Sequence, residues 1–582
     1  MNRFRVLMTV TAVFLFGTSD GRAQGTSDAA VQEGAKRTRT PIEHLIVVIG
    51  ENHTFDNLFG GYQPPEGQTV SNLLSKSIIN ADGTPGPNFS AAVQYRADDL
   101  LIYSIDPVKS GPYATLPQPN TTEAFGEPFF GPDRRFPANL PNGPFQITKY
   151  VPFDAYTGDP VHRFFQMWQE FDLGRLDLFP WVALTTGLGP QNFPPPTPVD
   201  TYQGGEAMGF YNMSTGDAAH FKAWAQAYSI SDNYHQGIMG GTGANFFYLA
   251  TGDVPFYTEN GAPGLPPSNQ IEDPNPVFGT KNFYTRDGYE GGSYVNCADP
   301  RQPGVASIQI YLRTLPYVPF RKGNCEPDHY YLVNNYNPGY TPSGEPMPLG
   351  PNFFTVPPQT VPTLAEALSA KGISWKWYSG GRNNGKPSLQ YCSICDPFTF
   401  STGVMTSALK DNLQGIFQFY QDVAGSGSLP EVSFVRPFES LAGHPADSTP
   451  AAYERFVADL ISRVQANPGL WASCAILITT DEGGGYYDSG FIQTLDFFGD
   501  GPRIPLIAVS PFAKPGHIDH TYADHASILK FIELNWGLAP LSGRSRDNLP
   551  NPIVLRGNRY VPANRPAIGD LTSLFNFPAG SD

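Results

Sequence analysis

The chain of 582 residues is long enough for several domains or for one large domain with insertions. Hydrophobic residues make up 40% of it and aromatic residues 13%, which excludes an intrinsically disordered chain. The formal net charge of −16 disfavours nucleic acid as a partner, and the 58 prolines and 60 glycines predict long irregular loops.

The N-terminus has the features of an export signal. Arginines precede an apolar run over residues 6–16, and Gly21-Arg22-Ala23 places small residues at −3 and −1 of a cleavage site. We therefore expect a signal peptide over 1–23, a mobile lead-in over 24–40, and a secreted or periplasmic protein. No later stretch reaches about 18 continuous apolar residues, so no integral membrane segment is expected.

The first predicted strand ends at polar side chains. Leu45-Ile-Val-Val-Ile-Gly50 is an apolar, β-branched run, and Glu51 and Asn52 follow it directly. Residues 61–149 then lack clear periodicity and predict a long surface insertion.

Two segments in the middle of the chain carry candidate catalytic residues. Asp159-Pro160 predicts the start of a helix, with His162 near its first turn, where a packed surface histidine is the simpler interpretation. Gly241-Thr242-Gly243 predicts a tight turn before a short helix that begins at Ala244. Thr242 there could cap the helix, or its hydroxyl could act as a nucleophile beside an anion site, and the two roles are compatible.

The remaining chain alternates helices and strands after a second predicted insertion over 254–350. Helices are predicted over 363–372, 452–465 and 524–533, strands over 373–378 and 429–435, and a loop holds His444. This alternation predicts one α/β domain over 41–582.

The run Ala475–Thr480 predicts a buried strand that stops at Asp481, Glu482 and three glycines. Adjacent carboxylates repel each other unless a cation or protons offset their charge, and ligands bind at the carboxyl ends of strands in open α/β sheets. A turn with solvated acids is the alternative. Because the strand before Glu51 and Asn52 ends in the same way, a metal site is the leading hypothesis.

The five cysteines fit an exported protein with a few bridges. Cys297, Cys325, Cys392 and Cys395 lie in predicted loops and are expected to be oxidised, with their pairing left open. Cys474 begins a predicted strand and is expected to be a buried free thiol. Half a zinc site at Cys392–Cys395 is a weaker alternative, because no second Cys/His pair follows at a suitable spacing.

Taken in chain order, these motifs resemble the bacterial phosphoesterase family that contains phosphatidylcholine-type phospholipases C and periplasmic acid phosphatases. The resemblance runs from about residue 41 to 540. The matching pieces are Glu51–Asp56, Gly241–Asn245, Leu429–Phe434, His444-Pro445, Asp481–Asp488 and the stretch from Gly501 to Glu533.

The resemblance implies an alkaline-phosphatase-like α/β fold, with a central sheet, helices on both faces and long irregular insertions. It implies one divalent metal ion (Ca, Mg, Mn or Zn), a phosphate ester or phospholipid as substrate, and a monomer. The positions that match the family are Glu51, Asn52, Asp481 and Glu482 as metal ligands, Thr242 as the nucleophile that also touches the metal, His162 and His444 facing the phosphate, and Asn245 at the substrate.

The expected function is that of an exported phosphoric ester hydrolase of the phospholipase C type. An acid phosphatase of the same family is the first alternative, and a non-catalytic secreted protein that binds a cation is the second. Phe246 and Gly483 depart from the family pattern, which has an arginine and a bulkier residue there, and both departures concern the substrate head group.

Overall fold

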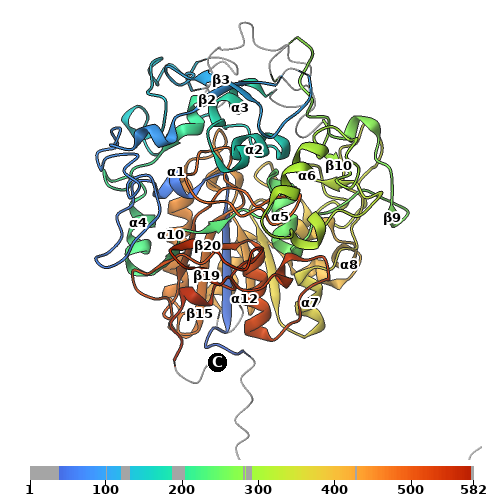
Figure 1. Cartoon of the computed structure of the whole chain (residues 1–582). Coiled ribbons are helices and arrows are strands. Elements are labelled where there is room, and N and C mark those ends of the chain that lie inside the picture. Colours follow the sequence, from blue (N-terminus) through green and yellow to red (C-terminus); the bar gives the residue numbers. More distant parts are fainter. Residues whose placement is uncertain are drawn as a thin grey trace, which may run out of the picture. The chain divides into compact units, whose positions relative to one another are not determined.

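An eight-stranded mixed sheet forms the centre of the fold (Figure 1). All of its strands are parallel except β16, which is antiparallel to both of its neighbours. The order across the sheet is β13 (Leu413–Gly415), β12 (Trp375–Ser379), β14 (Val432–Arg436), β1 (His44–Gly50), β15 (Cys474–Thr480), β16 (Leu506–Val509), β6 (Ser229–Ser231) and β17 (Ile518–Asp519).

The computed structural model describes the chain from Thr38 onward, except for a few segments. The predicted signal peptide over 1–23 and most of the predicted lead-in lie outside the described residues. The described residues are 38–99, 101–119, 132–186, 204–279, 282, 291–425 and 429–578. Among these, no helix is both long and apolar enough to cross a bilayer.

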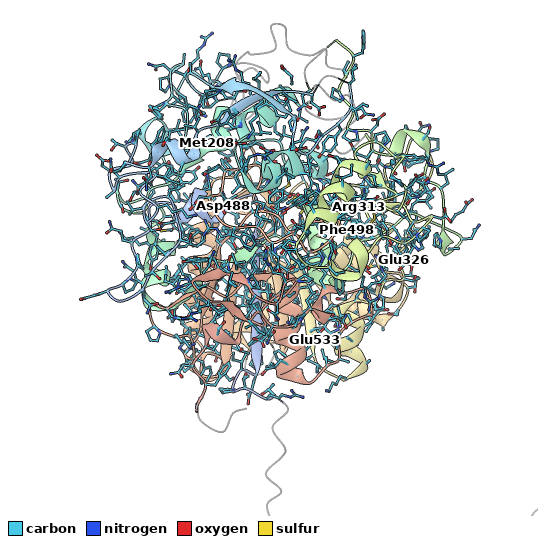
Figure 2. All side chains as sticks on the ribbon, viewed as in Figure 1. Met208, Arg313, Glu326, Asp488, Phe498 and Glu533 are labelled. Atoms are coloured by element: carbon cyan, nitrogen blue, oxygen red, sulfur yellow. A yellow bond between two sulfur atoms is a disulfide. The ribbon has the colours of Figure 1, made fainter. Side chains whose placement is uncertain are left out.

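The sheet is buried on both faces, as its apolar strands predict. Side chains fill the space around the sheet (Figure 2). Along β1, Leu45, Val47 and Ile49 pack into one hydrophobic core, while Ile46 and Val48 pack into a second core on the opposite face. This alternation follows from the period of two of a strand.

Helices cover both faces, which confirms the predicted α/β architecture. One core receives side chains from α2 (Phe164–Phe171), α5 (Thr242–Thr251), α6 (Val305–Thr314), α7 (Leu364–Ala370), α8 (Thr402–Met405) and α12 (Ala526–Trp536). The opposite core receives side chains from α1 (Phe55–Phe59), α4 (Ala219–Ala227), α9 (Ile416–Ala424), α10 (Pro450–Gln465) and α11 (Pro468–Trp471).

The regions predicted as insertions contain little regular structure where they are described. They hold α6, several 3₁₀ turns and short strand pairs. Helix α3 spans Phe179–Thr185. The two-stranded pairs of the described chain are β2 (Tyr95–Asp98) with β3 (Val108–Pro112), β4 (Phe145–Gln146) with β5 (Gly209–Phe210), β7 (Tyr234–His235) with β18 (Ala523–Asp524), β8 (Thr258–Glu259) with β9 (Ala262–Pro263), β10 (Tyr294–Val295) with β11 (Tyr331–Leu332), and β19 (Val554–Leu555) with β20 (Asn558–Pro562).

The predicted start of the helix after Asp159-Pro160 is wrong. Helix α2 begins at Phe164, and Arg163 before it is extended, with φ −108° and ψ 159°. The Phe164 amide donates to Oδ1 of Asn334 at 2.9 Å, so a side chain distant in sequence, and not Asp159, supplies the acceptor at the helix start. His162 therefore lies in an extended segment.

The cysteine predictions are confirmed. Cys297 is bonded to Cys325, and Cys392 is bonded to Cys395. Cys474 is a buried free thiol at the start of β15, and burial raises its pKa.

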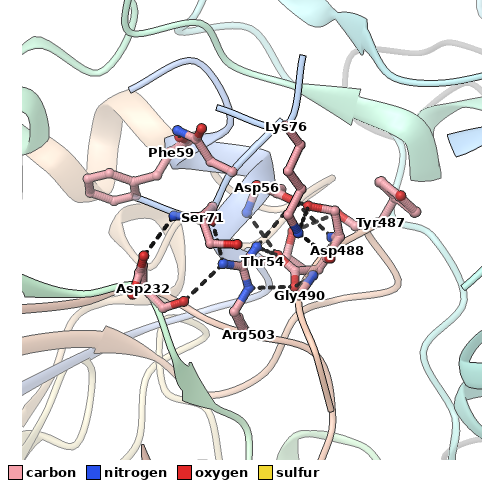
Figure 3. A network of polar contacts seen from close by, with 12 residues as sticks. Thr54, Asp56, Phe59, Ser71, Lys76, Asp232, Tyr487, Asp488, Gly490 and Arg503 are labelled. Carbon is pink, nitrogen blue, oxygen red and sulfur yellow. Dashed lines mark hydrogen bonds and ion pairs between the residues drawn. The ribbon is translucent and has the colours of Figure 1, made fainter. Parts of the chain in front are cut away.

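A buried ionic network ties α1 to the loop that follows Glu482 (Figure 3). Arg503 donates through Nε and Nη2 to the two carboxylate oxygens of Asp488, at 2.8 and 3.0 Å, and its Nη2 lies 3.3 Å from Asp56. Thr54 donates to the carbonyl of Tyr487 at 3.0 Å. Because Asp56 and Asp488 both lie a few residues beyond the predicted metal ligands, this network sets how the two strand ends face each other.

Candidate active site

The two strand ends that carry the predicted metal ligands are neighbours in the sheet. Strands β1 and β15 are paired in parallel, with Gly50 opposite Thr480, so the residues after them leave the sheet at the same edge. The Asn52 amide donates to Oδ1 of Asp481 at 3.2 Å. Asn52 has a φ of 63°, a left-handed conformation uncommon outside glycine, and such strain is concentrated at functional sites.

The glycines after Glu482 let three segments approach one another. Gly484 and Gly485 have φ of 61° and 71°. A Cβ on Gly484 would lie 2.5 Å from Cβ of Asn52, and one on Gly485 would lie 2.5 Å from the carbonyl oxygen of Val161. The glycines therefore allow the acid pair, Asn52 and the segment carrying His162 to pack together.

Thr242 lies at this meeting point. It is the first residue of α5, and Gly241 occupies the N-cap position, so the N-cap interpretation of Thr242 is wrong. Its hydroxyl donates instead to Oε1 of Glu482 at 2.8 Å. The short connection between β7 and α5 brings the helix N-terminus, where free N–H groups favour an anion, to the acid pair.

Three side-chain oxygens of the predicted ligands have no hydrogen-bond partner within the described residues. They are Oδ1 of Asn52, Oδ2 of Asp481 and Oε2 of Glu482, and all three are buried. Buried oxygens are normally paired, since an unpaired one costs about 1–3 kcal/mol. Carboxylate and amide oxygens suit hard divalent cations such as Ca²⁺, Mg²⁺ and Mn²⁺, and they bind Zn²⁺ as well. These residues therefore fit one divalent metal ion.

The pKa shifts of Asp481 and Glu482 also favour a bound cation at this site. Burial and then the charge of Glu51 raise the pKa of Asp481 well above its usual range. Burial and then the charge of Asp481 raise the pKa of Glu482 in the same way. A cation between these groups would offset the repulsion that raises both values.

Glu51 has partners that the sequence did not predict. Its Oε1 accepts from Nη2 of Arg436 and, at 3.1 Å, from Nε of the same guanidinium. Sγ of Cys395 lies 3.1 Å from that oxygen. Arg436 is the last residue of β14, which is the other neighbour of β1 in the sheet. The sequence held a signal for it, because the apolar run of β14 is a third one that stops at a charged residue.

His162 is oriented by its own loop. Its Nδ1 donates to the Pro160 carbonyl at 2.6 Å, which leaves Nε2 facing Asn52 at 3.5 Å and Oε1 of Glu482 at 3.7 Å. Burial lowers the pKa of His162 to about 4. The charge of the neighbouring Arg163 opposes part of the rise in the pKa of Glu482. Arg163 is a second charged residue that the sequence analysis did not predict.

His444 has the opposite charge preference. Burial lowers its pKa, but the carboxylates of Asp159, Glu51 and Asp447 outweigh burial and raise it to about 9. Its Nδ1 donates to the Pro445 carbonyl at 2.6 Å. His53, next to Asn52 in the chain, contacts the Gly443 carbonyl through Nε2 at 3.0 Å and so ties the His444 loop to the end of β1.

The side chains of Asn245 and Phe246 contact the loop before Thr242 and the hydrophobic core, respectively. Oδ1 of Asn245 accepts from the Ile238 backbone amide at 3.0 Å, and Nδ2 of Asn245 donates to the Gly240 carbonyl at 2.9 Å. The Asn245 side chain therefore holds the loop before Thr242. Its substrate-binding role stays a prediction. Phe246 is buried against Trp377, with ring centroids 6.1 Å apart, so the expected link between this departure and the head group has no support in its contacts.

Comparison with known proteins gives partial matches. The chain is 25% identical over 295 residues to the non-hemolytic phospholipase C of Pseudomonas aeruginosa, covering 44% of this chain and 39% of that protein. It is 24% identical over 234 residues to a probable acid phosphatase of Kluyveromyces lactis, covering 38% and 53%. The matched regions thus span between two fifths and about half of these relatives.

Structure comparison matches a protein of the alkaline phosphatase superfamily from Vibrio parahaemolyticus, at 10% identity and a TM-score of 0.27, covering 56% of this chain and 62% of that one. The sequence model of the phosphoesterase family matches residues 42–539, which include every predicted site residue. Because this match covers most of its length, the chain belongs to the phosphoesterase family.

Proposed function

We propose that this protein is a phosphoric ester hydrolase that uses Thr242 as its nucleophile and one divalent metal ion. The observation that carries the proposal is the Thr242 hydroxyl, which donates to Glu482 at 2.8 Å. Beside it lie three buried ligand oxygens that have no hydrogen-bond partner among the residues that the structure describes. A protein that only chelated a structural cation would have no need of a hydroxyl and two histidines at the same place.

The chain's own residues account for the movement of protons. Oε1 of Glu482 accepts the Thr242 proton as Oγ1 attacks phosphorus, and the bond from phosphorus to the leaving oxygen breaks. His444, protonated at neutral pH because of its raised pKa, donates a proton to the leaving alcohol. Neutral His444 then takes a proton from the water that attacks the phosphothreonine, the bond from phosphorus to Oγ1 breaks, and Glu482 returns its proton to the Thr242 oxygen.

The metal would be held by Asn52, Asp481, Glu482 and Glu51, with Thr242 in contact. When bound, a divalent cation supplies charge to offset the phosphoryl oxygens and to lower the pKa of the Thr242 hydroxyl. Oε1 of Glu51 accepts hydrogen bonds from Arg436, so Oε2 of Glu51 is the oxygen proposed to face this metal.

We place the substrate in the phospholipase C class, with acid phosphatase activity as the alternative. Relatives with both names support the two possibilities. The purified protein should be assayed on p-nitrophenyl phosphate, bis-p-nitrophenyl phosphate and phosphatidylcholine. Preference for the last two supports the phospholipase class, whereas turnover of the monoester alone supports the phosphatase.

A covalent intermediate tests the chemistry independently of the substrate class. Acid quenching during turnover, followed by peptide mass spectrometry, should find phosphate on Thr242. If no phosphopeptide is found while product forms in a pre-steady-state burst, the threonine mechanism is wrong.

The N-terminal pattern supports export as part of this proposal. N-terminal sequencing of protein recovered from the periplasm or the medium should begin at Gln24. Protein retained in the cytoplasm with Met1 intact would overturn it.

A further inference from the structure

The disulfide between Cys392 and Cys395 lies against a residue of the proposed active site. One carboxylate oxygen of Glu51 and the two sulfur atoms all lie within 4.8 Å of one another. Cys395 and Glu51 are buried, while Cys392 is half-buried and gives the pair a route to solvent. We propose that reduction of this disulfide creates a second metal site, in which Cys392, Cys395 and Glu51 bind a thiophilic divalent cation.

The ligand atoms lie close enough to reach one ion once the disulfide opens, and Sγ of Cys395 is already 3.1 Å from Oε1 of Glu51. Zinc binds thiolate sulfur at about 2.3 Å and carboxylate oxygen at about 2.0–2.2 Å, so neighbouring ligand atoms lie about 3.3–3.8 Å apart. The spacing Cys-x-x-Cys is the one that supplies two thiolates to one zinc ion. The sequence offers no second Cys/His pair at a suitable spacing after Cys395, but the fold provides Glu51 as a third ligand from a distant strand end.

The charges also suit a divalent ion. Two thiolates and the Glu51 carboxylate face the single guanidinium of Arg436, which contacts Glu51 through Nε at 3.1 Å. Arg436 also contacts Glu439 at 2.7 Å, so a divalent cation would offset most of the negative charge that remains. Cadmium and zinc prefer sulfur ligands, unlike the hard cations that suit the oxygens of Asp481 and Glu482.

The loop keeps its shape by means other than the disulfide. The Tyr391 hydroxyl donates to Oδ2 of Asp396 at 2.8 Å, so the two residues that flank the pair are linked to each other. Nη1 of Arg382 contacts the same carboxylate and lies 3.3 Å from the Tyr391 hydroxyl. Reduction would therefore leave the two thiols held together.

A role as a simple structural bridge explains this disulfide poorly. The stabilisation that a disulfide provides grows with the length of the loop that it closes. Cys392 and Cys395 are separated by 3 positions, whereas Cys297 and Cys325 are separated by 28. Cys-x-x-Cys disulfides are also the kind that dithiol reductants open readily.

The redox step balances with a dithiol reductant. The reductant gives two electrons and two protons, so that the bond between the two sulfurs breaks, two thiols form, and the reductant becomes a disulfide. Metal capture then releases the two thiol protons to solvent. Since Glu51 is also proposed to face the catalytic metal, occupation of the second site should inhibit the enzyme.

Cadmium binding tests the site without relying on catalysis. The intact protein is reduced with a phosphine, which water converts to its oxide, and is desalted and titrated with cadmium chloride. Mass spectrometry after alkylation records which cysteines were reduced. We expect an ultraviolet thiolate-to-cadmium charge-transfer band, with one cadmium per chain, in the reduced protein and none in the oxidised protein.

Variants identify the ligands. The double variant Cys392→Ser/Cys395→Ser should lose the band, whereas Cys297→Ser/Cys325→Ser should keep it. Glu51→Gln should raise the cadmium Kd at least about tenfold, and Thr242→Ala should bind cadmium normally although its hydrolase activity is lost.

The proposal is overturned by any of three results. The first is a reduced pair with no band, and the second is a band that survives in Cys392→Ser/Cys395→Ser. The third is a pair that an excess of phosphine leaves oxidised in the folded protein. An unchanged Kd in Glu51→Gln would remove Glu51 from the site.

Discussion

Oε1 of Glu482 accepts a hydrogen bond from the Thr242 hydroxyl at 2.8 Å, although the two residues are 240 positions apart in the chain. The other oxygen of the same carboxylate has no partner within the described residues. One carboxylate can therefore contact the nucleophile and a metal ion at the same time, and the first two predictions test this arrangement.

The Thr242→Ala variant should lose at least about four orders of magnitude in kcat, as enzymes do when a nucleophile is removed. Stability should change by only about 1 kcal/mol, because one hydrogen bond to Glu482 is lost. Steady-state assays and denaturant unfolding measure the two effects. Thr242→Ser keeps the hydroxyl and should retain substantial activity. A kcat of Thr242→Ala within about tenfold of the parent would point to metal-activated water instead.

The Asp481→Asn variant should lose both bound metal and activity, since it removes a charge from the proposed ligand set. Elemental analysis of the purified protein measures the metal directly. Asp519→Asn, which removes a carboxylate at the end of β17 outside the ligand set, serves as the control and should keep its metal. Undiminished metal in Asp481→Asn would contradict the site.

The activity should fall as the pH rises towards about 9, because the proton that His444 donates is then lost. A bound cation opposes the rise of this pKa, so the alkaline limb of kcat/KM should lie at or below that value. The titratable groups that interact with His444 are Asp159, Glu51, Asp447, Asp481, His53 and His162.

Asp159→Asn separates this assignment from alkaline unfolding. Asp159 is the first of the carboxylates that raise the pKa of His444, so its neutral variant should move the alkaline limb to lower pH. Circular dichroism across the same pH range should stay constant. If the limb does not move, another group donates the proton.

The Arg436→Leu variant should be destabilised by about 3–5 kcal/mol, because it leaves the Glu51 carboxylate buried without its partner. Denaturant unfolding of the metal-free protein measures this. Combining it with Glu51→Gln should recover part of the loss, since the unpaired charge is then absent. Strictly additive losses would show that the two side chains are not coupled.

The sequence determined the strands and where they stop. An apolar, β-branched run such as Leu45–Ile49 is stable only when both faces are buried, and the polar residue after it must lie at the sheet edge. The position of Glu51, Asn52, Asp481 and Glu482 at that edge could be predicted for this reason, and their role as metal ligands stays a prediction. Their order along the chain, together with Thr242, His162 and His444, carried the resemblance to the family that the family model then showed. The reduced state of Cys474 followed likewise from its place in a buried strand.

Contacts between distant segments were decided only by the tertiary structure. Asn334 sets the start of α2, because the first amides of a helix donate to any nearby oxygen, and local sequence does not show which oxygen is nearby. Arg436 and Cys395 reach Glu51 because β14 lies beside β1 and the loop after β12 folds back over it. The pKa values of His162 and His444 shift in opposite directions, because different carboxylates surround each ring. Burial and neighbouring charges depend on how distant segments pack, so local sequence does not show them.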